Sequence, residues 1–205
     1  MKLVLLALAL ALLAAPAVAQ DVAEPALRAE LVDRLAVEQD IRQRLIATGA
    51  FATGALADPT PEVAALLAEM MTTDADNLAF VEGVVDTHGW PTPALVGADG
   101  VNAAFLIVQH APPDVQGRML PLVEAAFRAG DLPGQSYALL LDRVLVGRGE
   151  PQVYGTQAAP GPDGEMVIAP TVDDATLDAR RAEVGLGTAA EYLATLKAVY
   201  AAPSE

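Results

Sequence analysis

The stretch FLIVQHAPPD, residues 105–114, joins an apolar segment to a histidine and then stops abruptly. Residues 101–111 are apolar nearly all round, which is typical of a helix at the centre of a core. Pro112 and Pro113 end this helix, because proline has no backbone N–H to donate. His110 therefore comes at the end of a helix expected to be buried. A buried imidazole needs a polar partner.

Amphipathic helices are predicted before this segment. Residues 24–48 place leucine and isoleucine near one face and charged residues on the other. A second helical region begins at Thr60-Pro61-Glu62, where threonine can cap, proline fits the first turn and glutamate favours the positive end of the dipole. It runs to His88, with a possible break around residues 72–76. TPALVGADG, residues 92–100, is predicted to be a loop.

Further helices are predicted over residues 114–129, 136–147, 173–184 and 188–201, with Asp173 or Asp174 capping the third of these. The apolar run in 136–147 also fits a buried strand. PQVYGTQ (151–157) and EMVIAP (165–170) are β-like and are separated by turn-forming residues, which predicts a β-hairpin over about 151–169. The fold class expected is mainly α: a compact multi-helix domain with one β-hairpin.

The first nineteen residues have the features of a secretory signal peptide. Lys2 precedes an apolar run over residues 3–15, and Ala17-Val18-Ala19 supplies small residues before a cut after Ala19. The run is shorter than the roughly 20 residues that span a bilayer. We therefore expect residues 1–19 to be removed and residues 20–205 to form a single globular domain. The protein would be exported, periplasmic or secreted, with no membrane insertion after cleavage.

Composition narrows the classes of partner. Without Lys2 the chain has 11 basic residues (12 − 1) and 27 acidic ones, a net charge of −16 (11 − 27). Such a surface repels phosphate backbones and anionic headgroups, so neither nucleic acid nor a membrane is an expected partner. The chain has no cysteine, which excludes disulfides and thiol chemistry despite the expected export.

Familiar catalytic motifs are absent. GQSYA around Ser136 lacks the final glycine of a nucleophile elbow and follows no convincing strand. There is no phosphate-binding loop and no dinucleotide glycine pattern, so no cofactor is expected. His88 and His110 lack the close spacing of zinc ligands, and no metal site is predicted. Many carboxylate pairs could serve glycoside hydrolysis, but no motif selects one.

The candidate site residues are polar positions in apolar or turn contexts. His110 is the leading candidate for acid–base chemistry, with Asp142 or Asp114 orienting it. If the hairpin folds against the end of the helix that carries His110, a polar pocket in an apolar wall would result. A buried network that only fixes the core would give the same pattern. The candidate ligand-binding residues are Gln109, Arg143, Gln152, Tyr154, Thr156, Gln157, His88 and Trp90.

Four of these candidates have simpler explanations. His88 falls at a predicted helix C-terminus, where an imidazole can bond to the last carbonyls. Trp90 fits a core position better than a ligand platform. Asp142 and Arg143 together fit an ion pair.

Several motifs resemble an uncharacterised bacterial domain family with no assigned function. The resemblance covers most of the chain after the signal peptide, and it implies a predominantly helical fold but no catalytic role for any residue. It also implies that the segments with QHA, DR and YGTQ form one site. The motifs are EQDIR (38–42), DADN (74–77), HGWPT (88–92), VQHA (108–111), LLDRVLV (140–146), QVYGTQ (152–157) and, more weakly, RRAEVGL (180–186).

Three functions therefore stay open. The first is a small-ligand-binding or accessory module of the cell envelope. The second is a hydrolase or lyase that uses His110 as general acid/base, with Arg143 or Gln157 holding an oxygen-rich substrate. In the third, the polar residues only hold the core together.

Overall fold

Prolines set the starts of four helices in the computed structural model. The first residues of α1 (Pro25–Ala47), α3 (Pro61–His88), α4 (Pro93–His110) and α5 (Pro113–Ala129) are all prolines. Proline is tolerated there because the first N–H groups of a helix have no partner within it. Thr60 and Thr92 cap α3 and α4 by accepting from backbone N–H groups three residues on.

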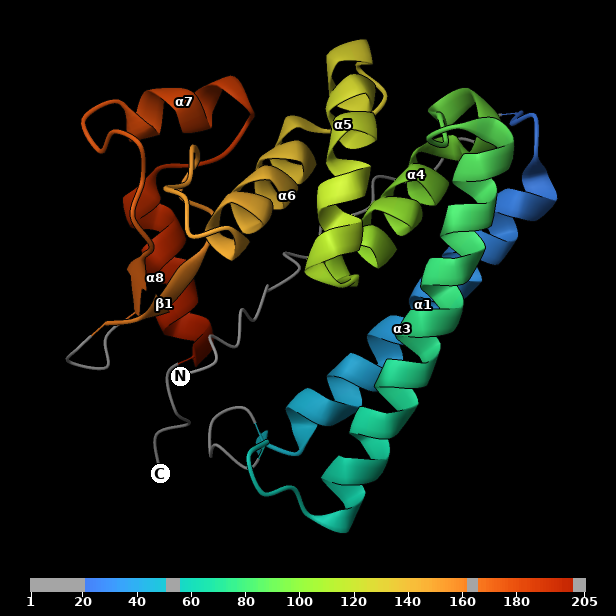
Figure 1. The fold of residues 1–205 in the computed structure, drawn as a ribbon, viewed down its shortest axis with the longest axis horizontal. Helices are drawn as coiled ribbons and strands as arrows, with labels where there is room; N and C mark the ends of the chain where they lie inside the picture. The colour runs from blue at the N-terminus through green and yellow to red at the C-terminus, as the bar shows by residue number, and fades with distance from the viewer. Residues whose placement is uncertain (1–20, 51–55, 162–165, 201–205) are drawn as a thin grey trace. The chain divides into compact units, whose positions relative to one another are not determined.

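The structure describes residues 21–50, 56–161 and 166–200, so the expected signal peptide lies outside the described residues. Within these ranges it has seven helices and one two-stranded hairpin, which confirms the mainly α fold class (Figure 1). The remaining elements are α6 (Gly134–Gly147), β1 (Ala158–Pro160), β2 (Met166–Ile168), α7 (Leu177–Glu183) and α8 (Ala189–Tyr200).

Contacts between Cα atoms divide the described chain into two units. The first spans residues 21–131, and the second begins at Leu132. In the first unit α1 packs against α3 and α4, and α4 also contacts α3 and α5 (Figure 1). In the second, α8 packs against β2 and contacts α7. A single globular domain over residues 20–205 stays a prediction.

The first unit has its core around α4, as the apolar sequence predicts. Ten of the 18 residues of α4 are buried, among them Phe105, Ile107 and Val108. One face of α1 adds Leu31, Ile41 and Leu45 to this unit's buried side chains. A helix buried on most of its surface needs neighbours on several sides, and α1, α3 and α5 provide them.

Two segments differ from the sequence-based prediction in this unit. Residues 93–100 are not a loop, because α4 begins at Pro93 and contains a kink at Gly97, where φ is +73°. A Cβ at Gly97 would lie 2.8 Å from Asp99 Oδ1 and 3.1 Å from Arg28 Nε, so this kink requires glycine. The predicted break around residues 72–76 does not occur, since α3 runs through it.

The hairpin is present, but its first strand is shorter and later than predicted. β1 pairs with β2 in antiparallel register, with Ala158 opposite Ile168 and Ala159 opposite Val167. PQVYGTQ itself is not a strand. Gln152 forms an isolated bridge with Thr171, and the N–H groups of Val153, Thr156 and Gln157 donate to side chains of the second unit. In the second unit α7 also starts later than residue 173, at Leu177, after a turn in which Asp173 accepts from the N–H of Ala175.

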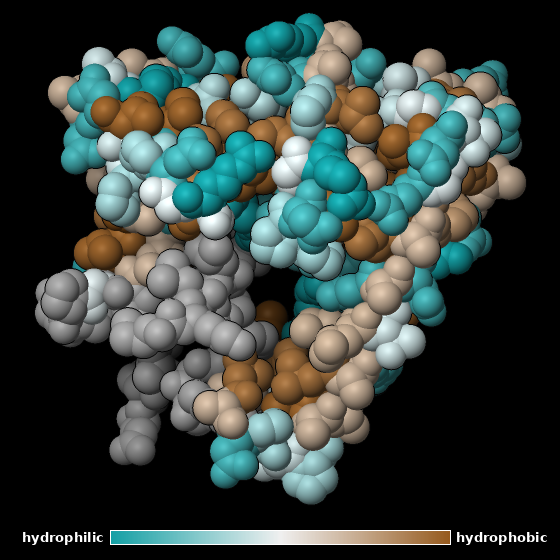
Figure 2. Space-filling view, in the orientation of Figure 1, coloured by the Kyte–Doolittle hydropathy of each residue, from teal (hydrophilic) through white to brown (hydrophobic). Residues whose placement is uncertain are grey.

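Apolar side chains gather at the end of the α1–α3 pair. Leu45, Ala50 and Val63 are buried there, with Leu56, Leu66, Leu67 and Met70 packed against them. Figure 2 shows this end as a brown region beside more hydrophilic surface. In the described part of the chain, no helix combines the length and the apolar character needed to cross a bilayer.

Trp90, directly after the glycine that ends α3, is buried with 8% of its surface exposed. Its indole Nε1 has no hydrogen-bond partner among the described residues. We therefore expect Trp90→Ala to lower the free energy of unfolding by about 3–5 kcal/mol. Trp90→Phe should cost much less, because it fills most of the space and breaks no hydrogen bond. Urea unfolding of the two variants measures this, and a fully stable Trp90→Ala protein would contradict it.

Candidate functional site

The end of α4 is fixed by a side chain of α5. Pro112 and Pro113 cannot donate to the last carbonyls of α4. Gln116 of α5 replaces them, since its Nε2 donates to the carbonyl oxygens of Gln109 at 2.8 Å and Ala111 at 3.0 Å. The two acceptors are the residues directly before and after His110. The APP sequence therefore ends the helix and also holds the backbone of His110 in place.

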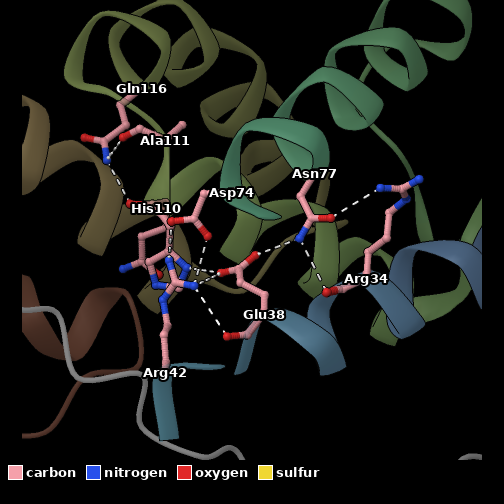
Figure 3. Close-up of polar contacts among 9 residues, drawn as sticks. Arg34, Glu38, Arg42, Asp74, Asn77, His110, Ala111 and Gln116 are labelled. Atoms are coloured by element: carbon pink, nitrogen blue, oxygen red, sulfur yellow. Dashed lines mark hydrogen bonds and ion pairs between the residues drawn. The ribbon is translucent and has the colours of Figure 1, made fainter. Parts of the chain in front are cut away.

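His110 is in direct contact with Glu38 of α1 (Figure 3). Its Nδ1 faces Glu38 Oε1, and this is an ion pair when the imidazole is protonated. The Glu38 side chain is only 1% exposed, whereas that of His110 is 12% exposed. A buried carboxylate is costly unless it is paired, so His110 and Glu38 depend on each other.

Two further donors reach the same carboxylate. Arg42, one helical turn along α1, places Nη1 3.1 Å from Glu38 Oε1. Asn77 of α3, itself buried, donates from Nδ2 to Glu38 Oε2 at 3.3 Å. Glu38 therefore has three partners, namely an imidazole, a guanidinium and an amide, and they come from α4, α1 and α3 (Figure 3).

Arg42 and Asn77 are in turn held by α3 and α1. The guanidinium of Arg42 donates to both carboxylate oxygens of Asp74, at 3.0 and 2.9 Å. Arg34 donates to Asn77 Oδ1 at 3.3 Å and lies 4.3 Å from the centre of the Phe80 ring. We call the set Glu38, Arg42, Asp74, Asn77 and His110 the His110 centre.

When Glu38 is ionised, the His110 centre selects one tautomer of neutral His110. An ionised carboxylate only accepts hydrogen bonds, so the proton of a neutral imidazole in this contact lies on Nδ1, and Nε2 carries the lone pair. Among the described residues, the hydrogen-bond partner of His110 is Glu38. This contact uses Nδ1, so it does not occupy Nε2. A group with these properties can accept a proton at Nε2 and pass it on as imidazolium paired with Glu38.

In the second unit the predicted residues gather around Asp142 of α6, which is completely buried. Its Oδ1 accepts from the N–H of Val153 at 2.8 Å and of Tyr154 at 3.0 Å. Its Oδ2 accepts from both the N–H and the hydroxyl of Thr156, at 2.9 and 3.0 Å. Asp142 thus binds the loop of residues 153–156, and both of its oxygens are used.

Further hydrogen bonds to this loop and its neighbours come from Gln152, Arg180, Arg181 and Tyr192. Gln152 donates to the carbonyls of Gln157 and Ala169 and accepts from the N–H of Gln157. The carbonyls of the loop accept from Arg180, Arg181 and the hydroxyl of Tyr192. Side chains therefore satisfy the N–H groups of residues 153, 154 and 156 and the carbonyls of residues 153–156, which is why these residues do not form a strand.

The other sequence-predicted residues have different settings. His88, the last residue of α3, is exposed, and Asp114 pairs on the surface with Arg118. Gln109 is buried, and its carbonyl accepts from Gln116. Gln157 donates to the hydroxyl of Thr156, and the ring of Tyr154 lies edge-on to that of Tyr137. Arg143 is buried, and this burial lowers its pKa to about 10.

The predicted site residues thus belong to both units. His110 and Gln109 lie in the first unit, whereas Asp142, Arg143, Gln152, Tyr154, Thr156 and Gln157 lie in the second. The sequence interpretation gave Asp142 or Asp114 the part of orienting His110, but the residue at Nδ1 is Glu38.

Glu38, Arg42, Asp74 and Asn77 were not among the predicted site residues, although a signal for two of them was present. Glu38 follows Leu31 by seven residues and precedes Leu45 by seven, so it occupies the apolar face of α1. Asn77 precedes Val81 by four residues and Val84 by seven, so it lies on the apolar face of α3. A polar residue on an apolar face marks a buried polar contact.

The fold and the site thus define a class: a mainly α protein in which a histidine contacts a buried glutamate. Residues 25–203 match the model of a family of unknown function, DUF6624, and the chain belongs to that family. No curated protein matches the chain, and neither does any solved structure.

Asp142→Asn tests the hold on the loop. The substitution places an amide NH2 against backbone donors and leaves some of them without an acceptor. We expect the free energy of unfolding to fall by about 3 kcal/mol or more. Glu150→Gln, at an exposed position just beyond α6, is the control and should change little. Chemical unfolding of both variants measures the effect, and equal stability would show that the loop does not depend on the charge of Asp142.

Arg143→Met should stabilise the protein at neutral pH. Burial lowers the pKa of Arg143 to about 10, well below the usual value for arginine, so burial of the charge opposes folding by about 3 kcal/mol. The pKa in the folded state lies below that in the unfolded state, so this penalty is complete below pH 10 and decreases as the pH rises towards the usual arginine pKa. The stability difference between variant and parent should therefore shrink above pH 10. A variant less stable than its parent at pH 7 would contradict this account.

Proposed function

We propose that this protein is an exported acid–base enzyme, a hydrolase or lyase, in which His110 transfers the proton. The observation that carries the proposal is the contact between His110 Nδ1 and a carboxylate buried to 99%. Such a partner orients the imidazole and stabilises the imidazolium that forms during proton transfer. In this proposal His110 is the catalytic residue, and Glu38 is a positioning residue.

The proton would follow one path in either reaction type. Nε2 of neutral His110 takes a proton from water in a hydrolysis, or from the substrate in an elimination. The resulting imidazolium, paired with Glu38, then gives that proton to the leaving group. The expectation of export rests on the features of residues 1–19.

A small-ligand-binding module of the cell envelope is the second candidate. In its favour, three side chains of the His110 centre are partly exposed side by side. They are His110, Arg42 and Asp74, with 12%, 19% and 24% of their side-chain surface exposed. Together they offer a donor, an acceptor and an imidazole to a polar ligand.

One experiment separates the two candidates. Pools of periplasmic metabolites and cell-wall fragments are incubated with the protein and with His110→Gln. Mass spectrometry then shows which components are consumed, and NMR shows which components shift the His110 signals. A component consumed only by the parent protein supports the enzyme. A component that shifts His110 and is recovered unchanged supports the binding module. No response of His110 to any pool would contradict both.

Chemical modification tests the reactivity of Nε2 without a known substrate. Diethyl pyrocarbonate acylates neutral imidazoles, and His88, exposed at the end of α3, provides a reference within the same molecule. We expect Glu38→Gln to slow modification of His110 about tenfold, because the carboxylate no longer polarises the ring. The rate at His88 should not change.

Asp33→Asn is the matched control for that substitution. Asp33 lies on the same helix, is exposed, and its replacement removes one negative charge far from the imidazole contact. It should leave the rate at His110 unchanged. A parent protein whose His110 does not react at all would show a sealed imidazole and sink the proposal.

A further inference from the structure

Arg42 lies between two carboxylates of different exposure. Its Nη1 is 3.1 Å from Glu38 Oε1 and 3.0 Å from Asp74 Oδ1, while its Nη2 is 2.9 Å from Asp74 Oδ2. The guanidinium also lies 3.5 Å from the backbone carbonyl of Glu38. Two parallel N–H bonds to Asp74 fix the plane of the guanidinium. That plane leaves Nη1 facing the oxygen that His110 uses.

The charges around His110 explain why this cation matters. Glu38 and Asp74 carry two negative charges and Arg42 one positive charge, so with neutral His110 this part of the centre has a net charge of −1. Asn77, the remaining group on Glu38, is neutral, and Arg34 beyond it pairs with Glu30. Arg42 is therefore the permanent cation in contact with Glu38 among the described residues.

Without that cation two changes would follow. The buried carboxylate of Glu38 would be less well compensated and would take up a proton from solvent. The neutral acid would then donate to Nδ1, and the proton of the neutral imidazole would lie on Nε2. The negative field at the imidazole would also grow, so His110 would stay protonated to higher pH. Either change removes the lone pair from Nε2 at neutral pH.

We infer that Arg42 is a positioning residue of the His110 centre: anchored by Asp74, it keeps the negative charge on Glu38 and so keeps Nε2 of His110 free to accept a proton. The inference rests on the proposed function, since it matters for catalysis only if His110 transfers protons. Its physical content is independent of any substrate.

The chain contains a close internal control. Arg44, two residues further along α1, also joins α1 to α3 by an ion pair, 2.7 Å from Glu69, and pairs with Asp40 within its own helix at 3.2 Å. The side chains of Arg44 and Glu69 are each about half exposed, so this ion pair contributes little to stability. Arg42 and Arg44 differ in one relevant respect, which is contact with Glu38.

The experiment compares Arg42→Gln, Arg42→Lys and Arg44→Gln in the purified full chain. The pH dependence of the His110 ring signals in NMR gives the midpoint of its protonation, and diethyl pyrocarbonate gives the reactivity of Nε2. We expect Arg42→Gln to raise the midpoint by about one pH unit or more and to slow the modification at pH 7. Arg42→Lys, which retains the charge, should restore most of both values, and Arg44→Gln should change neither.

The outcomes separate this inference from the proposed function. Arg42→Gln behaving like Arg44→Gln, while Glu38→Gln still slows the reaction of His110, overturns the role of Arg42 and leaves the proposed function standing. Unchanged reactivity in Glu38→Gln overturns the proposed function itself. Equal effects of Arg42→Gln and Arg42→Lys show that packing, not charge, is involved, and this also overturns the inference. If Arg42→Gln does not fold, Arg42→Lys still tests the inference. A shift in the midpoint of His110 protonation in the lysine variant would contradict the inference, because lysine retains the charge.

Discussion

The first unit depends on a carboxylate in its core. Glu38 is 1% exposed and lies on the face of α1 that otherwise carries Leu31, Ile41 and Leu45. A charge at such a position is tolerated only with partners around it. The partners come from three helices, so the burial of Glu38 requires α1, α3 and α4 to meet in one register. The same requirement brings His110 to a defined place with one ring nitrogen engaged.

Six of the seven sequence motifs, all except HGWPT (88–92), fall into two groups in the structure. Residues of EQDIR, DADN and VQHA meet at Glu38 in the first unit. Residues of LLDRVLV, QVYGTQ and RRAEVGL meet at Asp142 and its loop in the second. Each group is centred on one buried carboxylate. The partners that each carboxylate needs therefore explain why these short motifs lie far apart in the chain. This explanation does not require the two groups to form one site.

Much of the fold could be predicted because it depends on local signals. Prolines at helix starts, glycines at helix ends and the apolar stretch before His110 act within a few residues of themselves. The kink at Gly97 and the loop at residues 153–156 depend on side chains distant in sequence, Arg28 in one case and Asp142 in the other. Glu38 was missed for the same reason. Its position on an apolar face indicates burial, but it does not indicate which partner lies opposite.

The two buried carboxylates have different partners, and this difference separates their roles. Asp142 accepts from backbone N–H groups and a hydroxyl, none of which gives up a proton near neutral pH, and these bonds hold the loop. Glu38 accepts from an imidazole, which exchanges protons in that range and is itself 12% exposed. A purely structural need would be met by donors of the first kind. A histidine held by a buried glutamate, with a cation fixed beside that glutamate, has the components needed to move a proton, and this arrangement supports the proposal made for His110.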